Sequence, residues 1–533
     1  MPQHHAICNQ ATEWSFVSAK TRRDPFHDIE LDVLFQGPEG RTWRVPAFWA
    51  GDSEWRVRFA PPLTGSYTYR TICSDEADPD LHDVRGTLEA HPDKGANPLL
   101  RHGPLQISAN RRYLEHRDGT PFFWLGDIWW LGLTKRLAWP DGFCQLAADR
   151  AAKGFSVILL TAGLPCDMAA FDPRSVNEAG FPWEPDYRRI NPAFFDMADL
   201  RIRGLVRAGL TPCIVGAWSF YLDWMGIERM TQHWRYLIAR WGAYPVIWCL
   251  GGTVPLPWYL DPDRETRMPA LRQGWGEVAR YIRRMDPYGH PLVTHTIPGV
   301  EPLTAEDEDL LDARALFTGI GRPDAFGRSL TTVQEALARE PHKPVIQIEG
   351  GFEGARAEVD TQRLAFWALT LSGMAGFTYG ANGIWQANNP GDPFGPSPWG
   401  VAMGDTPWEV AAQYPGSTQL GIGKALLERY PWWAFTPHPE WVTPHADGEN
   451  PTAPYAAGIP GQVRVIYLPR LFFPPPRGEG ATVEELEPEV NYTARFMDPR
   501  TGQAHDLGLV TGSPRWTIPL PPTMGDWLVT LER

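Results

Sequence analysis

The first hundred residues alternate between apolar and polar positions with the period of two that is typical of β-strands. Four such runs cover residues 30–40, 41–52, 54–74 and 84–92, and Gly, Pro and Asp residues separate them. Short strands at this spacing predict a small antiparallel β-sandwich over residues 1–98.

From residue 99 to 434 the pattern changes, because short apolar runs now alternate with segments of helical period. Since eight parallel strands close a barrel, this region is expected to form a (β/α)8 TIM barrel, an α/β fold. The eight runs are residues 121–130, 155–163, 211–218, 245–253, 291–297, 315–321, 343–351 and 375–385.

Two intervening helices have readable boundaries. Asn191 and Pro192 stand where an N-cap and a first helical residue are favoured, and Gly209 stands near the expected end of that helix. In the segment 264–287, Pro269 is expected to delay the start of the helix.

After residue 434 the strand pattern returns in residues 461–470, 491–503 and 527–533. These runs predict a second antiparallel β-sandwich over residues 435–533. The predicted organisation is therefore a barrel flanked by two small β domains. A chain of 533 residues is too long for one hydrophobic core, which agrees with this division.

The charge of the chain argues against two classes of partner. It has 49 basic and 63 acidic residues, a formal net charge of -14, so neither nucleic acid nor a membrane is expected to bind it. No signal-peptide pattern and no run of 18 apolar residues occurs, which predicts a cytoplasmic protein. The oligomeric state stays open.

The six cysteines are widely spaced, show no CxxC motif and mostly lie in apolar runs. They are interpreted as buried thiols in a reducing compartment. The sequence also lacks GxSxG, GxxxxGK[ST] and HExxH motifs, and its histidines have no metal-ligand spacing. Neither a metal nor another cofactor is therefore expected.

The chain is rich in aromatic residues, with 25 Trp, 24 Phe and 16 Tyr. Flat aromatic rings stack on the apolar faces of sugars, so this load favours a carbohydrate ligand. Aromatic side chains also fill cores, and composition alone does not separate the two interpretations.

Active sites of TIM barrels lie at the carboxyl ends of the strands, and this rule selects the candidate residues. Glu349 follows the apolar run VIQI, where a carboxylate is costly to desolvate, so we expect a catalytic role, with a structural ion pair as the alternative. Asp127 is expected to contact substrate or to orient its neighbours. His295 is expected either to donate to a sugar hydroxyl or to Glu349, or to be a satisfied core residue.

Further candidate substrate-binding residues stand at the same strand ends. The aromatic ones are suited to stacking on a sugar, and their alternative role is to cap the barrel core. The set consists of Trp130, Trp218, Glu353, Tyr379, Asn382 and Trp385.

Several motifs spread along the chain carry a family resemblance. They include FFWLGDIWW, RWGAYPVIWCLGGT, KPVIQIEGGFEG, WALTLSGMAGFTYGANGIW and YPGSTQLGIGKALLERYPWW. With them the chain resembles the apiosidase-like glycoside hydrolases, with the accessory β-sandwich that often precedes their barrel and a small β domain that follows it. The resemblance implies hydrolysis of a glycosidic bond at a terminal sugar of an oligosaccharide or in a small glycoside, with Glu349 as nucleophile.

At one position the sequence departs from the family pattern. Relatives carry an acidic residue after the two glycines of the strand-four motif, as the general acid, whereas this chain has Thr253. Glycoside hydrolysis normally uses two carboxyl groups, and a threonine hydroxyl does not replace one of them.

Three explanations for Thr253 stay open. The leaving group of the substrate needs little protonation, hydrolysis has been lost and the protein is a catalytically silent carbohydrate-binding protein, or another carboxylate reaches in from a loop. The loop candidates are Asp167, Asp172, Glu184, Asp223 and Asp261.

Overall fold

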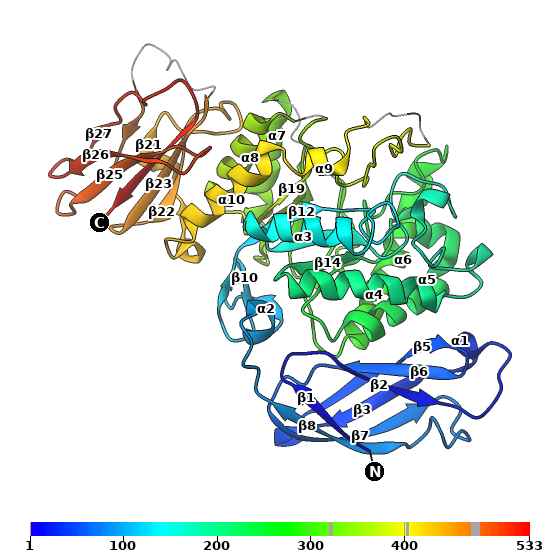
Figure 1. The fold of residues 1–533 in the computed structure, drawn as a ribbon. Coiled ribbons are helices and arrows are strands. Elements are labelled where there is room, and N and C mark those ends of the chain that lie inside the picture. The colour runs from blue at the N-terminus through cyan, green and yellow to red at the C-terminus, as the bar shows by residue number, and fades with distance from the viewer. Residues whose placement is uncertain are drawn as a thin grey trace.

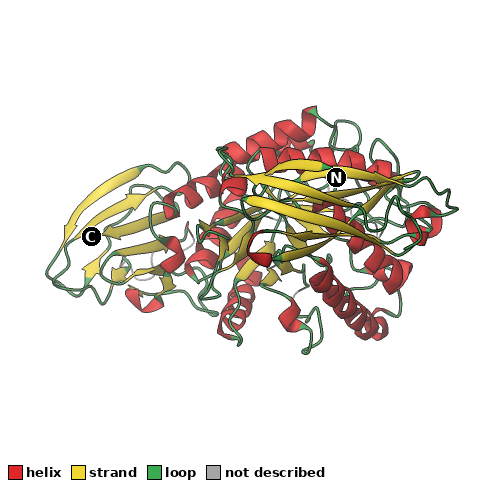
Figure 2. Cartoon of the chain, turned by 90° about the horizontal axis from the view of Figure 1, so that it is seen from below, coloured by secondary structure: helices red, strands yellow, loops and turns green. Residues whose placement is uncertain are grey.

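The structure is a computed structural model that describes residues 2–297, 299–318, 323–355, 357–398, 400, 404–470 and 480–533. The chain forms a central barrel with a β-sandwich on either side, the N-terminal one blue and the C-terminal one orange to red in Figure 1. Seen from below, the N-terminal sandwich lies across the barrel, whereas the C-terminal sandwich extends to one side (Figure 2).

Eight parallel strands form one sheet, in the order β16-β15-β14-β13-β12-β19-β18-β17. The two end strands are also linked, since the Asp312 N–H donates to the Leu292 carbonyl (2.9 Å) and the Thr296 hydroxyl to the Ala315 carbonyl (3.0 Å). The predicted TIM barrel is thus confirmed as a nearly closed ring. Its strands are β12 (Trp124–Ile128), β13 (Val157–Thr161), β14 (Thr211–Val215), β15 (Ile247–Cys249), β16 (Leu292–Val293), β17 (Arg314–Phe317), β18 (Val345–Glu349) and β19 (Gly376–Tyr379).

Seven of the eight predicted apolar runs contain a strand of this ring, and the sixth run, residues 315–321, overlaps β17, which begins one residue earlier at Arg314. Each strand is shorter than its run. Residues 319–321, at the end of the predicted sixth strand, lie outside the described residues. The outer layer consists of α3 (Asp141–Ala152), α4 (Pro192–Arg207), α5 (Phe220–Trp241), α6 (Arg264–Met285), α7 (Pro323–Ala338), α8 (Val359–Leu371), α9 (Trp408–Ala411) and α10 (Pro415–Leu427).

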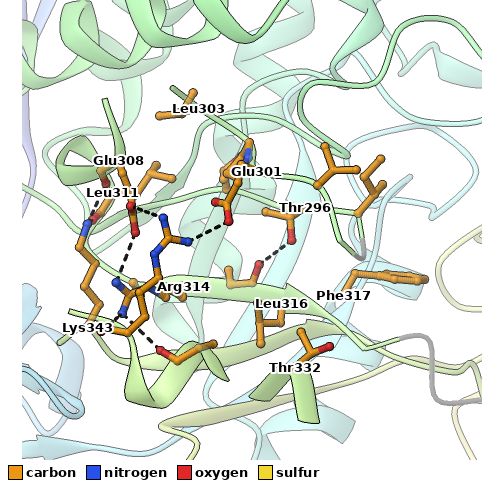
Figure 3. A pocket seen from close by; sticks show the side chains of 18 of the residues that line it. Thr296, Glu301, Leu303, Glu308, Leu311, Arg314, Leu316, Phe317, Thr332 and Lys343 are labelled. Carbon is orange, nitrogen blue, oxygen red and sulfur yellow. Dashed lines mark hydrogen bonds and ion pairs between the residues drawn. The ribbon is translucent and has the colours of Figure 1, made fainter. Parts of the chain in front are cut away.

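The fifth βα unit departs from the regular barrel. Between β16 and β17 the described residues hold the short 3-10 helix η4 (Glu308–Leu310) and no α-helix. A cavity of about 430 Å³ lies there, between these strands and α7. Figure 3 shows Lys343, Glu308 and Arg314 toward one end of it and Thr296, Phe317 and Thr332 toward the other.

The charged groups of this cavity are engaged with one another. Arg339 pairs with Glu301 and Glu308, and Arg314 also pairs with Glu308. The cavity lies beside β16, β17 and α7, and at one end of it the Phe317 ring lies 5.9 Å from the His295 ring. It is the space that the absent fifth helix leaves uncovered.

The helix boundaries test two sequence expectations. The Asn191 side chain caps α4 by accepting the Ala193 N–H (3.2 Å), with Pro192 as the first helical residue, as predicted. The prediction that Pro269 delays the start of α6 is wrong, because α6 begins at Arg264. Pro269 lies near the amino end of the helix, where the missing N–H gives up a single hydrogen bond.

Each flanking domain pairs a larger sheet with a three-stranded one, as predicted for a sandwich. The pairing is antiparallel except between β1 and β8, which run parallel and so depart from the expectation. The N-terminal sheets are β1 (Gln3–Ile7), β8 (Arg85–His91), β7 (Gly65–Cys73), β3 (Leu31–Gln36), β4 (Thr42–Pro46), and β2 (Thr12–Val17), β6 (Glu54–Phe59), β5 (Phe48–Gly51).

The C-terminal sheets follow the same plan. They are β20 (Thr436–Pro437), β22 (Tyr455–Ile459), β23 (Val463–Leu468), β28 (Trp527–Glu532), β25 (Tyr492–Met497), β26 (Ala504–Val510), and β21 (Val442–Thr443), β24 (Thr482–Val483), β27 (Trp516–Thr517). The sheets lie on either side of the boundaries that the sequence predicts at residues 98 and 434, and the boundaries themselves stay predictions.

A small sheet and several short helices complete the fold. A sheet of β9 (Leu105–Ile107), β10 (Leu114–His116) and β11 (Pro121–Phe122) precedes the first barrel strand. The short helices are α1 (Pro25–Asp28), η1 (Pro38–Gly40), α2 (Pro98–Arg101), η2 (Pro173–Ser175), η3 (Pro185–Tyr187), η5 (Trp432–Ala434) and η6 (Pro439–Trp441).

All six cysteines are free thiols, and five of them are buried. The exception is Cys144, which is exposed on α3 and differs from the expectation of buried thiols. None of the described helices combines the length and apolar character that crossing a bilayer requires.

A buried ion pair joins each sandwich to the barrel. Asp199 of α4 accepts hydrogen bonds from Arg58 of β6 and from Arg240 of α5. On the other side, Arg363 of α8 donates twice to the Asp526 carboxylate, at 2.8 Å each. Because a buried charge is costly without its partner, these pairs fix where the sandwiches sit.

We expect Asp199→Asn to destabilise the protein by about 3 kcal/mol, because it removes the buried carboxylate that two buried guanidinium groups share and leaves them only partly exposed partners. The matched control is Asp196→Asn, since Asp196 also pairs with Arg240 but its side chain is 48% exposed. Urea unfolding followed by tryptophan fluorescence measures both. Equal, small losses in the two variants would contradict the role of Asp199.

Candidate functional site

Glu349 is the last residue of β18 and stands at the carboxyl end of the barrel. Its strand is buried up to this residue, whereas the Glu349 side chain retains 12% exposure. Gln347, two residues earlier and therefore on the same face of the strand, accepts a hydrogen bond from the Thr378 N–H (2.8 Å) of β19. The period of the strand thus carries the Glu349 carboxylate toward the mouth of the ring.

His295, just after β16, holds this carboxylate. Its Nδ1 faces the backbone N–H of Thr253 (3.1 Å) and its Nε2 faces Oε2 of Glu349 (3.1 Å). Since the Thr253 N–H is a donor, Nδ1 accepts, which assigns the imidazole proton to Nε2. His295 therefore donates to Glu349, which is one of the two functional roles expected from the sequence.

Aromatic rings surround this pair. Trp130 and Trp218 lie 5.9 and 5.5 Å from the His295 ring between centroids, and 5.2 Å from each other. Trp218 rests directly on Gly252, where an added Cβ would come within 2.1 Å of the indole. The glycine before Thr253 is thus required for the close approach of this ring, and the two indoles form one wall of the mouth.

Asp167, in the loop after β13, is the second carboxyl group of the mouth. Burial and the nearby negative charge of Glu349 raise the pKa of Asp167 to about 6, although a hydrogen bond from Tyr259 acts in the opposite direction. The charge of Glu349 also raises the pKa of the neighbouring Cys166 thiol, after burial and Asp167. Asp167 and Glu349 therefore lie within electrostatic reach of one another.

The other four loop carboxylates are each held by arginine. Asp172 pairs with Arg174, and Glu184 pairs with Arg188 and Arg189. These bonds lower the pKa of both carboxyl groups against the effect of burial. Asp223 and Asp261 share Arg267. A paired carboxylate is a poor proton donor at neutral pH, so Asp167 is the candidate that differs.

Thr253 itself has a strained backbone with φ of 52°. Its hydroxyl is buried and finds no hydrogen-bond partner among the residues that the structure describes. Thr253 contributes its backbone N–H to the site, and this N–H fixes the tautomer of His295.

Three predicted site residues do not face the mouth. Asp127 is fully buried and accepts from Arg150 of α3 (2.6 Å). The Tyr379 hydroxyl donates to Glu353 (2.6 Å), whose carboxylate also accepts the Gly416 N–H at the start of α10. Asp127 also accepts from the Trp129 indole N–H (2.9 Å), so it orients a neighbour, which is one of the roles expected for it. The substrate-binding roles of Glu353 and Tyr379 stay predictions.

The two remaining candidates lie in the loop after β19 and are almost fully buried. Asn382 accepts from Gln386 (2.6 Å), and the Trp385 ring packs on Phe352 and Phe394 at 6.0 and 5.4 Å. The structure thus brings together Glu349, His295, Trp130 and Trp218, whereas Asn382 and Trp385 contact residues of the loops after β18 and β19.

Sequence reasoning missed two residues of this region. Arg150, the partner of Asp127, reads as one of many charged residues on a helix. Tyr259, the hydrogen-bond donor to Asp167, follows Trp258 in a loop without a recognisable motif. The helical period of α3 places Arg150 on the buried face of that helix. This was the one feature of the sequence that could have indicated a buried partner for Asp127.

Comparisons with known proteins agree with the geometry. The family described as Apiosidase-like, catalytic domain matches residues 108–434, and the family described as Domain of unknown function (DUF5060) matches residues 8–74. No curated protein matches the chain.

Solved structures share the fold. A putative glycoside hydrolase from Bacteroides vulgatus ATCC 8482 covers 100% of both chains with a TM-score of 0.70 at 16% identity. A family 5 glycoside hydrolase from the same organism covers 83% of this chain and 95% of its own, with a TM-score of 0.65 at 19% identity. A third structure, named glycoside hydrolase, covers 82% of this chain and 98% of its own, with a TM-score of 0.64 at 20% identity.

We expect His295→Ala to lower kcat/KM for a glycoside about 10- to 100-fold, because Glu349 loses a hydrogen bond to its charged form. Steady-state kinetics on the best substrate of an aryl glycoside panel measures the loss. His295→Gln keeps an N–H near the position of Nε2 and should recover part of the activity. The control is His342→Ala at an exposed histidine, and an unchanged His295→Ala would refute the assignment.

Proposed function

Since the chain belongs to the apiosidase-like family of glycoside hydrolases, we propose that it hydrolyses a terminal glycosidic bond with Glu349 as nucleophile and Asp167 as proton donor. The substrate is a terminal sugar of an oligosaccharide or a small glycoside. The observation that carries the proposal is the position of Asp167 close to Glu349, as the one loop candidate that no arginine of the described residues pairs with. The family acid position near it holds Thr253.

The two carboxyl groups have different environments, and this difference assigns their roles. Glu349 receives the His295 N–H, which favours its negative charge. Asp167 is buried beside that charge, and its pKa of about 6 keeps part of the population protonated near neutral pH. Glycosidases use one ionised carboxylate as nucleophile and one protonated carboxyl group as acid.

In the first step the Glu349 carboxylate attacks the anomeric carbon, and the bond from this carbon to the glycosidic oxygen breaks. Asp167 gives its proton to that oxygen, so the leaving group departs as a neutral alcohol. In the second step Asp167, now a carboxylate, takes a proton from water, and the hydroxide attacks the anomeric carbon. Glu349 departs as a carboxylate, and both groups return to their starting state.

The alternative is a catalytically silent carbohydrate-binding protein, which the threonine at position 253 favours. Asp167 argues against this alternative, because placing one carboxyl group close to another costs stability. Such a cost is typical of groups that a functional site needs. Measured turnover separates the two proposals, since the silent protein hydrolyses no substrate.

We expect Asp167→Asn to reduce kcat/KM about 10²- to 10⁴-fold on a glycoside with a poor leaving group, because protonation of the leaving oxygen is lost. The loss should shrink for a dinitrophenyl glycoside, which needs little protonation. Asp172→Asn, a carboxylate of the same loop that Arg174 already holds, is the matched control. Equal losses on both substrates would exclude Asp167 as the acid.

The pH dependence of kcat/KM tests the role of Asp167 independently. Asp167 acts in its protonated form, so kcat/KM of the wild-type protein should fall as the pH rises through about 6. In Asp167→Asn this basic limb should disappear. A limb that stays in the variant would assign the proton to another group.

A further inference from the structure

We infer that Trp224 and Trp258 form the surface on which the leaving group binds, and that this leaving group is a flat aryl ring. The inference rests on the proposed function, because the leaving group must lie beside its proton donor, Asp167. It adds the chemical class of the substrate on that side of the scissile bond.

Both tryptophans belong to the carboxyl ends of barrel strands. Trp224 lies in the first turns of α5, which follows β14, before the backbone break at Gly226 (φ 78°, ψ 165°). Trp258 lies in the loop after β15. Since Asp167 follows β13, three neighbouring strands bring these residues to one side of the mouth.

Ring contacts connect the tryptophans to the proton donor. Trp258 packs on Tyr259 with centroids 5.3 Å apart, and the Tyr259 side chain hydrogen-bonds to the Asp167 carboxyl group. Phe220 contacts Trp224 and Trp258 at 4.7 and 4.9 Å. Tyr259 therefore links Trp258 to the Asp167 carboxyl group.

The four aromatic residues Phe220, Trp224, Trp258 and Tyr259 differ in their exposure to solvent. Phe220 and Tyr259 are buried, whereas Trp224 and Trp258, with centroids 5.2 Å apart, are half-buried. Leu260, two residues beyond Trp258, is 55% exposed. Exposed apolar side chains that gather beside a catalytic group indicate a binding surface for an apolar ligand.

The charged groups of the same rim favour an aryl ring over a second sugar. Arg267 pairs with both Asp223 and Asp261 through its Nη1, so the two carboxylates of this rim are already engaged with a cation. A sugar needs hydrogen-bond partners for its hydroxyl groups, whereas an aryl ring gains its binding energy from stacking and burial.

Kinetics on two glycosides of the same sugar test the inference, one with a phenyl and one with a methyl leaving group. Trp258→Ala should lower kcat/KM for the phenyl glycoside about tenfold and leave the methyl glycoside within about twofold, since stacking is lost with one of them. Trp258→Phe should keep most of the activity, and Trp433→Ala, at a 39% exposed tryptophan beyond α10, is the control. Equal losses on both glycosides would overturn the inference and assign Trp258 to the support of Tyr259.

A binding measurement separates this inference from the proposed function. Titration of the Glu349→Gln protein with 4-fluorophenol, followed by ¹⁹F NMR, reports aryl binding without turnover. Saturable binding that Trp258→Ala weakens supports the surface, even if no glycoside is hydrolysed and the proposed function fails. The absence of saturable binding, or binding that Trp258→Ala leaves unchanged, overturns the inference.

Discussion

Two carboxyl groups share the mouth of the barrel, and the electrostatic cost of charging both of them shapes the site. Glu349 receives the N–H of His295, whereas Asp167 is buried beside the charge of Glu349. The negative charge is therefore favoured on one group and the proton on the other. The proposed nucleophile and the proposed acid differ through their surroundings, although both are carboxyl groups.

The rest of the fold serves to hold this pair in place. The backbone of Thr253 directs the proton of His295 toward Glu349, and Trp130 and Trp218 enclose the imidazole. In the outer layer, Asp127 and Arg150 tie the first barrel strand to α3 by a fully buried ion pair. Barrel positions that the sequence alone assigns to substrate thus stabilise the scaffold.

The periodicity of the sequence predicted the architecture well, because burial on both faces of parallel strands leaves continuous apolar runs. It also located Glu349, since a carboxylate directly after such a run has few structural explanations. It did not reveal the partners of Asp127 and Tyr379, because both faces of a barrel strand are buried and a run does not show which face points inward. Gly126 and Thr378 meet inside the ring. Asp127 and Tyr379 are the next residues along the same strands, so they point to the opposite face, and the apolar runs alone do not show this.

Asp167, the proposed proton donor, was among the candidates of the sequence analysis but was not singled out by it. Five loop carboxylates fitted equally well, and what distinguishes Asp167 is the arginine partners of the other four. Such pairings join residues of different loops or depend on loop conformation, so no local pattern reveals them. The missing fifth helix was likewise hidden, because the segment between β16 and β17 is long enough to hold one.

The role of Glu349 as nucleophile is tested most directly by trapping the covalent intermediate. A panel of 2-deoxy-2-fluoro glycosides with dinitrophenyl leaving groups is incubated with the protein, and intact mass and peptide mapping by mass spectrometry locate the label. The account predicts one glycosyl group on the peptide that contains Glu349, attached to that carboxylate. A label on a different carboxylate, or hydrolysis of a member of the panel that leaves no label on Glu349, would contradict it.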